Sequence, residues 1–168
     1  KNDTLHTLVR SVVGQQISVK AADAIWNRLD EACNNSITEN NLLELSIEDM
    51  RKTGLSNTKS NYIMNIVNAN LSELDWEDMN DDEVSNELCK IKGIGPWTAD
   101  MFLIFRLGRT NILPLGDIGL VNAINLHYNN KEKLSKEELM KFKKKWSPWC
   151  SIATWYMWRS LDPVPVEY

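Results

Sequence analysis

Apolar residues recur at helical spacing along almost the whole chain. Leu5, Leu8 and Val12 form one such stripe, and Val84 and Leu88 belong to another. No segment shows the alternation of apolar and polar residues that is typical of a half-buried strand. The pattern therefore predicts an all-α fold.

Short polar residues stand where several of these helices are expected to begin. Ser46 with Asp49 and Ser135 with Glu138 have the spacing of capping boxes. Asp117 occupies the position of an N-cap ahead of another apolar run. We expect helices to begin directly after residues 46, 117 and 135.

The last expected helix follows Pro148 and is rich in aromatic residues. Five of its apolar residues would share one face if the segment is helical, which predicts that this face belongs to the core: Trp149, Ile152, Ala153, Tyr156 and Met157.

The composition is that of a globular protein, with 168 residues, of which 43% are hydrophobic and 25% charged. We expect one domain over residues 1–168, with an upstream segment missing because the chain begins at Lys1. Neither a membrane span nor a signal peptide can be recognised, which favours an intracellular protein that contacts no membrane. The three cysteines never form a C-x-x-C pair, which argues against a zinc or iron–sulfur site and against a metal bound by side chains.

Residues 84–108 contain two helical patterns separated by the sequence K-G-I-G-P-W-T, in which Gly93 and Gly95 are one residue apart. Glycines permit a tight turn and the close approach of another molecule. The helix that Pro96 begins would direct its first N–H groups outward, where they can bind a phosphate. The expected DNA contacts are the backbone of Gly93, Ile94 and Gly95 together with the side chains of Lys92 and Thr98. The net charge of −4 argues against a nucleic-acid partner, but neutral amides can bind phosphate locally. A lone G-x-G also fits an ordinary turn between two helices.

The chain resembles the helix-hairpin-helix superfamily of DNA glycosylases, and within it the alkylbase or 3-methyladenine DNA glycosylase II branch. Three stretches carry the resemblance: V-V-G-Q-Q-I-S-V-K-A-A at 12–22, I-K-G-I-G-P-W-T-A-D at 91–100, and W-S-P-W-C-S-I-A-T-W-Y-M-W at 146–158. The resemblance implies a two-lobed helical fold with DNA in the cleft between the lobes. It also implies a monovalent cation held by the hairpin carbonyls of Cys89, Ile91 and Ile94.

The resemblance places the catalytic aspartate at Asp117. Cleavage of a base from deoxyribose builds positive charge on the sugar, which a nearby carboxylate can stabilise. A plain N-cap would explain an isolated aspartate, but its place after the hairpin favours catalysis. The lysine with which strand-nicking relatives form a Schiff base falls at Trp97 in this chain, so the resemblance implies hydrolysis without lyase activity.

The same resemblance assigns a base pocket and a residue that fills the gap left by the flipped base. Trp97 and Trp158 would line the pocket, and their electron-rich rings suit cationic alkylated purines. Met101 and Ile118 stand where relatives have tyrosines, so the range of substrates is expected to differ. Gln15 and Gln16 lie in the turn expected to enter the DNA, with Gln16 as the wedge, although a polar turn between two helices explains them nearly as well.

The sequence thus predicts a monofunctional, cofactor-free and monomeric glycosylase that acts on alkylated bases, of the 3-methyladenine and 7-methylguanine type, in double-stranded DNA. Its compartment would be the bacterial cytoplasm or the eukaryotic nucleus. Two alternatives remain: a glycosylase for mismatched or oxidised bases, and a non-catalytic helix-hairpin-helix module that only binds DNA.

Overall fold

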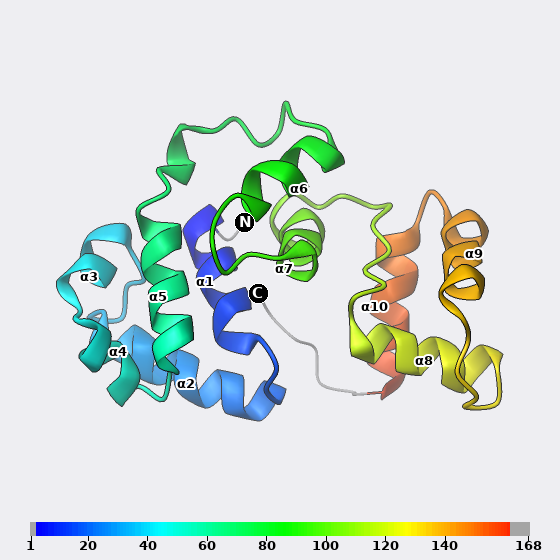
Figure 1. Ribbon diagram of the computed structural model, residues 1–168, viewed down its shortest axis with the longest axis horizontal. Coiled ribbons are helices and arrows are strands. Elements are labelled where there is room, and N and C mark those ends of the chain that lie inside the picture. Colours follow the sequence, from blue (N-terminus) through cyan, green and yellow to red (C-terminus); the bar gives the residue numbers. More distant parts are fainter. Residues whose placement is uncertain (1–2, 162–168) are drawn as a thin grey trace.

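The computed structural model describes residues 3–161, and the regular structure in this range is helical (Figure 1). The prediction of an all-α fold is therefore confirmed for these residues. The elements are α1 (Thr4–Gly14), α2 (Val19–Ala32), α3 (Glu39–Glu44), α4 (Ile47–Lys52), α5 (Asn57–Val67), η1 (Leu71–Glu73), α6 (Asp81–Cys89), α7 (Pro96–Met101), η2 (Phe102–Arg106), α8 (Ile118–Tyr128), α9 (Lys136–Trp146) and α10 (Cys150–Leu161).

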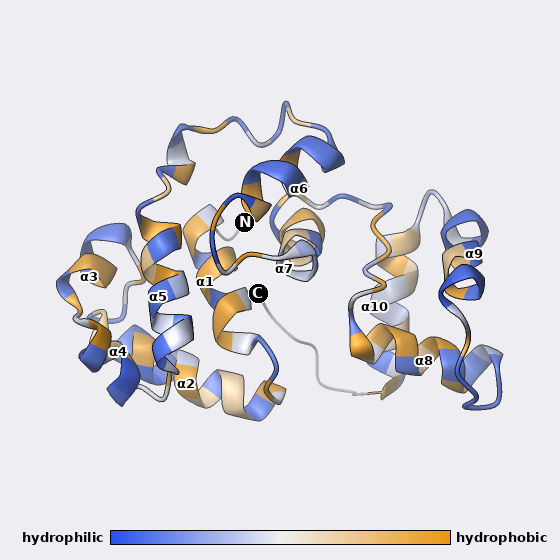
Figure 2. Cartoon of the chain, in the orientation of Figure 1, coloured by the Kyte–Doolittle hydropathy of each residue, from blue (hydrophilic) through white to orange (hydrophobic). Residues whose placement is uncertain are grey.

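The helices form two lobes, each with its own hydrophobic core (Figure 1). The first lobe extends from α1 to η2, and α1 lies at its centre with most of its side chains buried. The second lobe contains α8, α9 and α10 around a smaller core, and an irregular linker (107–117) joins it to the first. In Figure 2, α9 is hydrophilic over most of its length, in keeping with the exposed lysines of its last turns.

The helix starts expected from short polar residues are confirmed. Ser46 and Ser135 each form a complete capping box, and the Asp117 carboxylate accepts a hydrogen bond from the backbone amide of Leu120 in α8. A further capping box was not predicted: Asn80 pairs with Glu83 and begins α6 at residue 81. These caps satisfy N–H groups that the first turn of a helix leaves without partners.

The two helical patterns of residues 84–108 are both present as helices. The helix before the hairpin ends at Cys89, and the helix after it changes to π geometry over Phe102–Arg106. The prediction that the apolar residues after Pro148 are core was wrong in large part, because Trp149, Ile152 and Tyr156 are 55%, 44% and 62% exposed. Small polar side chains of α10 are buried against the rest of the protein instead, those of Ser151 and Thr154 among them.

Candidate active site

Three N–H groups surround the carboxylate of Asp117, which is only partly exposed at the start of α8. Its Oδ1 accepts hydrogen bonds from the backbone amide of Leu120 at 2.7 Å and from Trp158 Nε1 at 2.8 Å. Its Oδ2 accepts one from Trp97 Nε1 at 2.9 Å. Because an ionised carboxylate offers about four acceptor positions, roughly one remains on Oδ2 for a reacting group or a water molecule.

The donors to Asp117 come from both lobes. Trp97 is the second residue of α7 in the first lobe, whereas Trp158 lies on α10 in the second. The carboxylate therefore lies where the two lobes meet, at the end of the linker. Gly119 makes room for this arrangement, since a Cβ there would lie 3.1 Å from Asp117 Oδ1 and 3.6 Å from the Trp158 ring.

An aromatic wall that the sequence did not reveal continues from Trp158. The ring of Phe105 stacks on it with centroids 6.0 Å apart and an interplanar angle of 13°. Phe105 belongs to the π segment, whose wider turn changes the direction of the side chains that follow α7. Such π segments occur often at functional sites. An irregular segment leaves no mark in a helical hydrophobic pattern, so the pattern could not have identified Phe105.

The hairpin between α6 and α7 has two glycines with different roles. Gly93 has φ +108°, and a Cβ on it would lie 2.2 Å from Tyr62 Cγ, so only glycine fits against that ring. A Cβ on Gly95 would meet no heavy atom within 4 Å. Gly95 is also the N-cap of α7 and gives the helix no side-chain cap. Gly93 is thus required by the fold, while Gly95 borders open space.

The hairpin side chains near the expected DNA contacts differ in exposure. Lys92 is exposed, as a phosphate contact requires, but the side chain of Ile94 is 5% exposed and belongs to the core. Thr98 is 2% exposed, and its hydroxyl accepts a hydrogen bond from Gln15 Nε2 at 3.3 Å. Gln15 also donates to the carbonyl of Gly93 at 3.2 Å. In this conformation the Thr98 hydroxyl and the Gln15 amide nitrogen are engaged within the protein, and contact of these two residues with DNA stays a prediction.

The remaining residues assigned by resemblance lie in three different environments. Gln16 is exposed in the turn after α1, with φ +56°. Ile118 is 75% exposed beside Asp117, so it can contact a ligand at that site. Met101 is 1% exposed, and in this conformation it offers a base almost no surface.

The hairpin carbonyls assigned to a monovalent cation are partly engaged. The Ile91 carbonyl accepts the amide of Ile94 at 3.0 Å, although a carbonyl oxygen can accept a second partner. Over residues 3–161, no group of three or more histidine, cysteine, aspartate or glutamate side chains is placed to hold a metal ion. Nor is any helix in that range long and apolar enough to cross a membrane.

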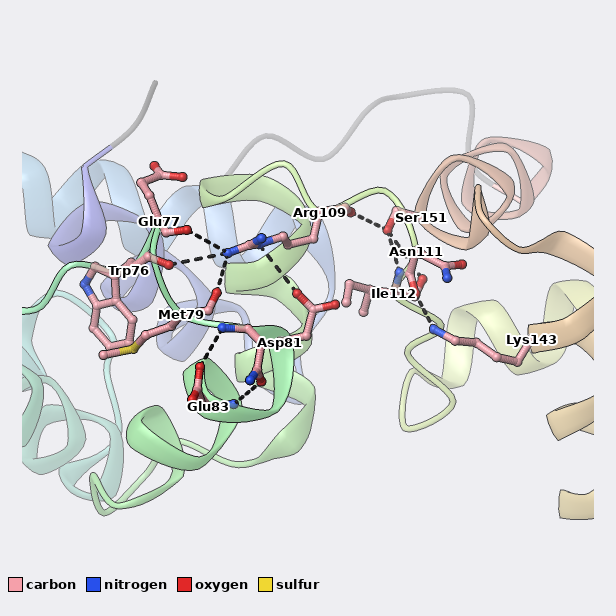
Figure 3. Close-up of polar contacts among 11 residues, drawn as sticks. Trp76, Glu77, Met79, Asp81, Glu83, Arg109, Asn111, Ile112, Lys143 and Ser151 are labelled. Carbon is pink, nitrogen blue, oxygen red and sulfur yellow. Dashed lines mark hydrogen bonds and ion pairs between the residues drawn. The ribbon is translucent and has the colours of Figure 1, made fainter.

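Arg109 fastens the linker to the first lobe (Figure 3). Its guanidinium donates to the carbonyl of Met79 at 2.7 Å and to those of Trp76 and Glu77 at 3.5 Å. The ion pair with Asp81 measures 3.5 Å. These partners belong to the segment that leads into α6, so Arg109 connects the linker with the first helix of the hairpin motif.

The second lobe holds the neighbouring linker residues (Figure 3). Ser151 Oγ donates to the carbonyl of Arg109 at 2.6 Å and accepts the amide of Ile112 at 3.0 Å. Lys143 donates to the carbonyl of Asn111. Both lobes are thus attached to the same short linker. These contacts fix the distance between Asp117, at the end of the linker, and the hairpin.

Asp100 is a partly buried carboxyl group on α7. Burial raises its pKa from 3.8 to about 6, although the charge of Lys143 acts in the opposite direction. The folded protein therefore holds a proton on Asp100 at pH values where the unfolded chain has lost it. Ionisation of this group reduces stability as the pH rises from 3.8 to about 6, and the loss persists above that window.

Replacing Asp100 with asparagine should remove the loss of stability that ionisation of Asp100 causes. We expect the variant to be more stable than the parent by about 1 kcal/mol at pH 8, after allowance for its partial exposure, and to lose the advantage below pH 3.8. Urea unfolding at several pH values measures the difference. Asp78→Asn, which alters an exposed loop carboxylate, is the matched control. A stabilisation that did not depend on pH would contradict the explanation.

A cavity of about 270 Å³ lies in the first lobe and shares no lining residue with the site around Asp117. Its lining includes Asp3, Trp76 and Arg106. It is therefore a separate feature from the place where Trp97 and Trp158 meet.

A family model described as the HhH-GPD superfamily of base excision DNA repair proteins matches residues 9–148. DNA-3-methyladenine glycosylase 1 of Schizosaccharomyces pombe is 31% identical over 167 residues, which cover 95% of this chain and 73% of that protein. A Bacillus subtilis relative, provisionally named a DNA-3-methyladenine glycosylase, is 38% identical over 125 residues. That match covers 72% of this chain, which spans only 44% of the relative's length.

Solved structures agree with these sequence comparisons. The Schizosaccharomyces pombe 3-methyladenine DNA glycosylase in complex with abasic DNA superimposes with a TM-score of 0.86 and 30% identity, over 96% of this chain and 83% of that one. The DNA-3-methyladenine glycosidase of Bacillus halodurans superimposes with a TM-score of 0.79 and 34% identity, over 96% and 77% of the two chains.

Proposed function

The chain belongs to the HhH-GPD superfamily of base excision DNA repair proteins, and on that basis we propose that it is a monofunctional DNA glycosylase that removes alkylated bases. The observation that supports this proposal best is the environment of Asp117, whose carboxylate is held by two indole N–H groups and one backbone amide. The relatives named as DNA-3-methyladenine glycosylases support the choice of substrate.

Asp117 would act by electrostatic stabilisation. As the glycosidic bond breaks, positive charge develops on the sugar, and a carboxylate fixed in advance lowers the energy of that transition state without first having to reorient. The three donors supply this fixed orientation, and the free acceptor position on Oδ2 can face the sugar or the attacking water. The reaction releases the base and leaves an abasic site.

The DNA would be held by the hairpin and entered by the turn after α1. At the hairpin, Gly95 borders open space and α7 lacks a side-chain cap, so backbone N–H groups are available to a phosphate. The exposed Gln16 would fill the place of the extruded nucleotide, whose removal from the stack costs a few kcal/mol. The whole chain would work in this way as one monomeric glycosylase domain, in whichever compartment holds the DNA.

Preference for alkylated purines would come from the aromatic rings around the carboxylate. Trp97, Phe105 and Trp158 provide electron-rich surfaces, and an indole attracts a cationic ring by roughly 0.5–2 kcal/mol. Alkylation of a purine also weakens its bond to the sugar. Normal bases have neither advantage.

Release of bases from methylated duplex DNA tests this proposal. The purified protein is incubated with DNA treated with a methylating agent, and the free bases are separated and identified. We expect 3-methyladenine and 7-methylguanine. Release of mismatched or oxidised bases instead, from matched duplexes, would favour a different lesion specificity, and release of no base from any of them would favour a module that only binds DNA.

Borohydride should fail to trap a covalent complex between this protein and DNA. The position at which strand-nicking relatives carry the lysine holds Trp97, whose indole nitrogen donates to Asp117 and cannot form an imine. The measurement is a gel assay for a protein–DNA adduct after reduction, with a known bifunctional glycosylase as the positive control. An adduct with this protein would contradict hydrolysis by water alone.

A further inference from the structure

Three polar side chains, those of Gln15, Lys59 and Asn65, donate hydrogen bonds to backbone carbonyls of the two segments assigned to DNA contact. Lys59 Nζ donates to the carbonyl of Val13 at 2.8 Å and to that of Gln15 at 2.7 Å, at the end of α1. Asn65 Nδ2 donates to the carbonyl of Lys92 at 2.9 Å, in the hairpin. Lys59 and Asn65 lie six residues apart on α5, so one helix supports both segments.

Gln15 connects the two segments directly. Its Nε2 donates to the carbonyl of Gly93 in the hairpin loop and to the hydroxyl of Thr98 in the first turn of α7. Because a carbonyl can only accept, the amide nitrogen must face the hairpin. In Figure 1 the loop between α6 and α7 passes beside α5 and α1, as these bonds require.

The ring of Tyr62 fills the space between these polar contacts. It lies on α5 between Lys59 and Asn65, and its Cγ would be 2.2 Å from a Cβ at position 93. Burial lowers the pKa of Lys59, as expected for an ammonium group that exchanges water for two backbone carbonyls. The turn after α1 and the hairpin are thus joined through a packed ring and five hydrogen bonds.

We propose that Lys59, Gln15 and Asn65 are positioning residues that hold the α1–α2 turn and the hairpin at a fixed separation, so that Gln16 enters the base stack while the hairpin holds the backbone. This inference rests on the proposed function, which assigns the DNA contacts. The three residues bind backbone carbonyls and need not touch DNA. They act on extrusion of the nucleotide, the step that requires both segments at once.

The position of these bonds explains why they would affect extrusion more than chemistry. Asp117 is held by Trp97, Trp158 and its own helix, and none of these contacts involves the three positioning residues. A looser turn would therefore leave the carboxylate in place but let Gln16 enter the stack in many orientations. A lesion that is already unstacked needs no such insertion and should escape the defect.

The test uses Lys59→Met, Gln15→Leu and Asn65→Leu, with Lys59→Arg as the conservative variant. Single-turnover release of 3-methyladenine is measured from a fully paired duplex and from a duplex in which the lesion faces an abasic analogue and is poorly stacked. We expect about a 10- to 100-fold loss on the paired duplex, less than about a threefold loss on the unstacked one, and partial recovery with arginine.

Asn41→Ala is the matched control. Asn41 Nδ2 also donates to two backbone carbonyls, those of Cys33 and Ser36, but it lies at α3, away from both DNA-contact segments. It should change neither rate. Thermal unfolding of every variant identifies those that are folded, and Gln15→Leu carries the test if Lys59→Met does not fold. Equal losses on the two duplexes, or no loss on either, would overturn the proposal.

A second readout separates this inference from the proposed function. A duplex with 2-aminopurine beside an abasic analogue reports unstacking by a rise in fluorescence when the protein binds, and it requires no excision. Suppose that the parent protein gives the rise but releases no alkylated base. The proposed substrate would then be wrong, and a smaller rise with Gln15→Leu than with Asn41→Ala would still support the positioning role. Equal rises with these two variants would overturn it.

Discussion

Replacing Asp117 with asparagine is expected to slow release of the alkylated base by about 100- to 1,000-fold while DNA binding is retained. Asparagine keeps an oxygen that can accept from Leu120 and cap α8, but it removes the negative charge that would face the sugar. It also places an amide nitrogen opposite the Trp97 N–H, where the second carboxylate oxygen now accepts. Single-turnover excision and equilibrium binding to DNA with an abasic analogue measure the two effects.

Asp3→Asn provides the control for this substitution. Asp3 is the N-cap of α1 and accepts from the amide of Leu5 at 2.8 Å, so the same exchange occurs in the same capping role away from the site. Its excision rate should match that of the parent. If Asp117→Asn released the base within a few-fold of the parent rate, the carboxylate would not be catalytic.

Gly93→Ala should destabilise the folded protein by about 3 kcal/mol or more. The alanine would have to adopt φ +108°, which residues with a Cβ avoid, and its methyl group would lie 2.2 Å from Tyr62 Cγ. Relief requires that either the ring or the hairpin move, and both are part of the same packed contact. Urea or thermal unfolding gives the loss of stability, and DNA binding should fall with it.

Gly95→Ala separates the fold of the hairpin from its contact with DNA. The added methyl group meets no heavy atom within 4 Å, so stability should change by less than about 0.5 kcal/mol. DNA binding should nevertheless weaken, because the methyl group would stand where a phosphate has to approach the backbone. Equal losses of stability in the two variants would contradict the different roles given to these glycines.

The helices and the carboxylate were accessible from the sequence because their signals are local. A capping residue acts on amides two or three positions away, so Ser46, Ser135 and Asp117 identified their helices correctly. Hydrophobic spacing predicted the helical class for the same reason. For α10 the spacing indicated the wrong buried side, since Ile152 and Tyr156 are exposed, because a helix with apolar residues on several sides does not reveal which side is covered.

The partners of the candidate site depend on contacts between distant segments. Trp97 and Trp158 could be named as aromatic residues of a base pocket, but only the folded chain turns their N–H groups toward one carboxylate, across 61 positions of sequence. Phe105 joins them through a π segment that has no sequence signature. Gln15 was assigned to DNA by resemblance, whereas its amide is bound to the hairpin.

What the sequence by itself determined is therefore the helical class, several helix starts and the place of Asp117 as the N-cap of α8, since each depends on residues a few positions apart. The tertiary structure alone decided which side chains bind the Asp117 carboxylate and which bind the hairpin backbone, as Trp97 and Gln15 illustrate. The physical reason is that a hydrogen bond needs its two partners within about 3 Å and correctly oriented. For residues as distant in the sequence as Gln15 and Thr98, only the packing of the first lobe can specify that.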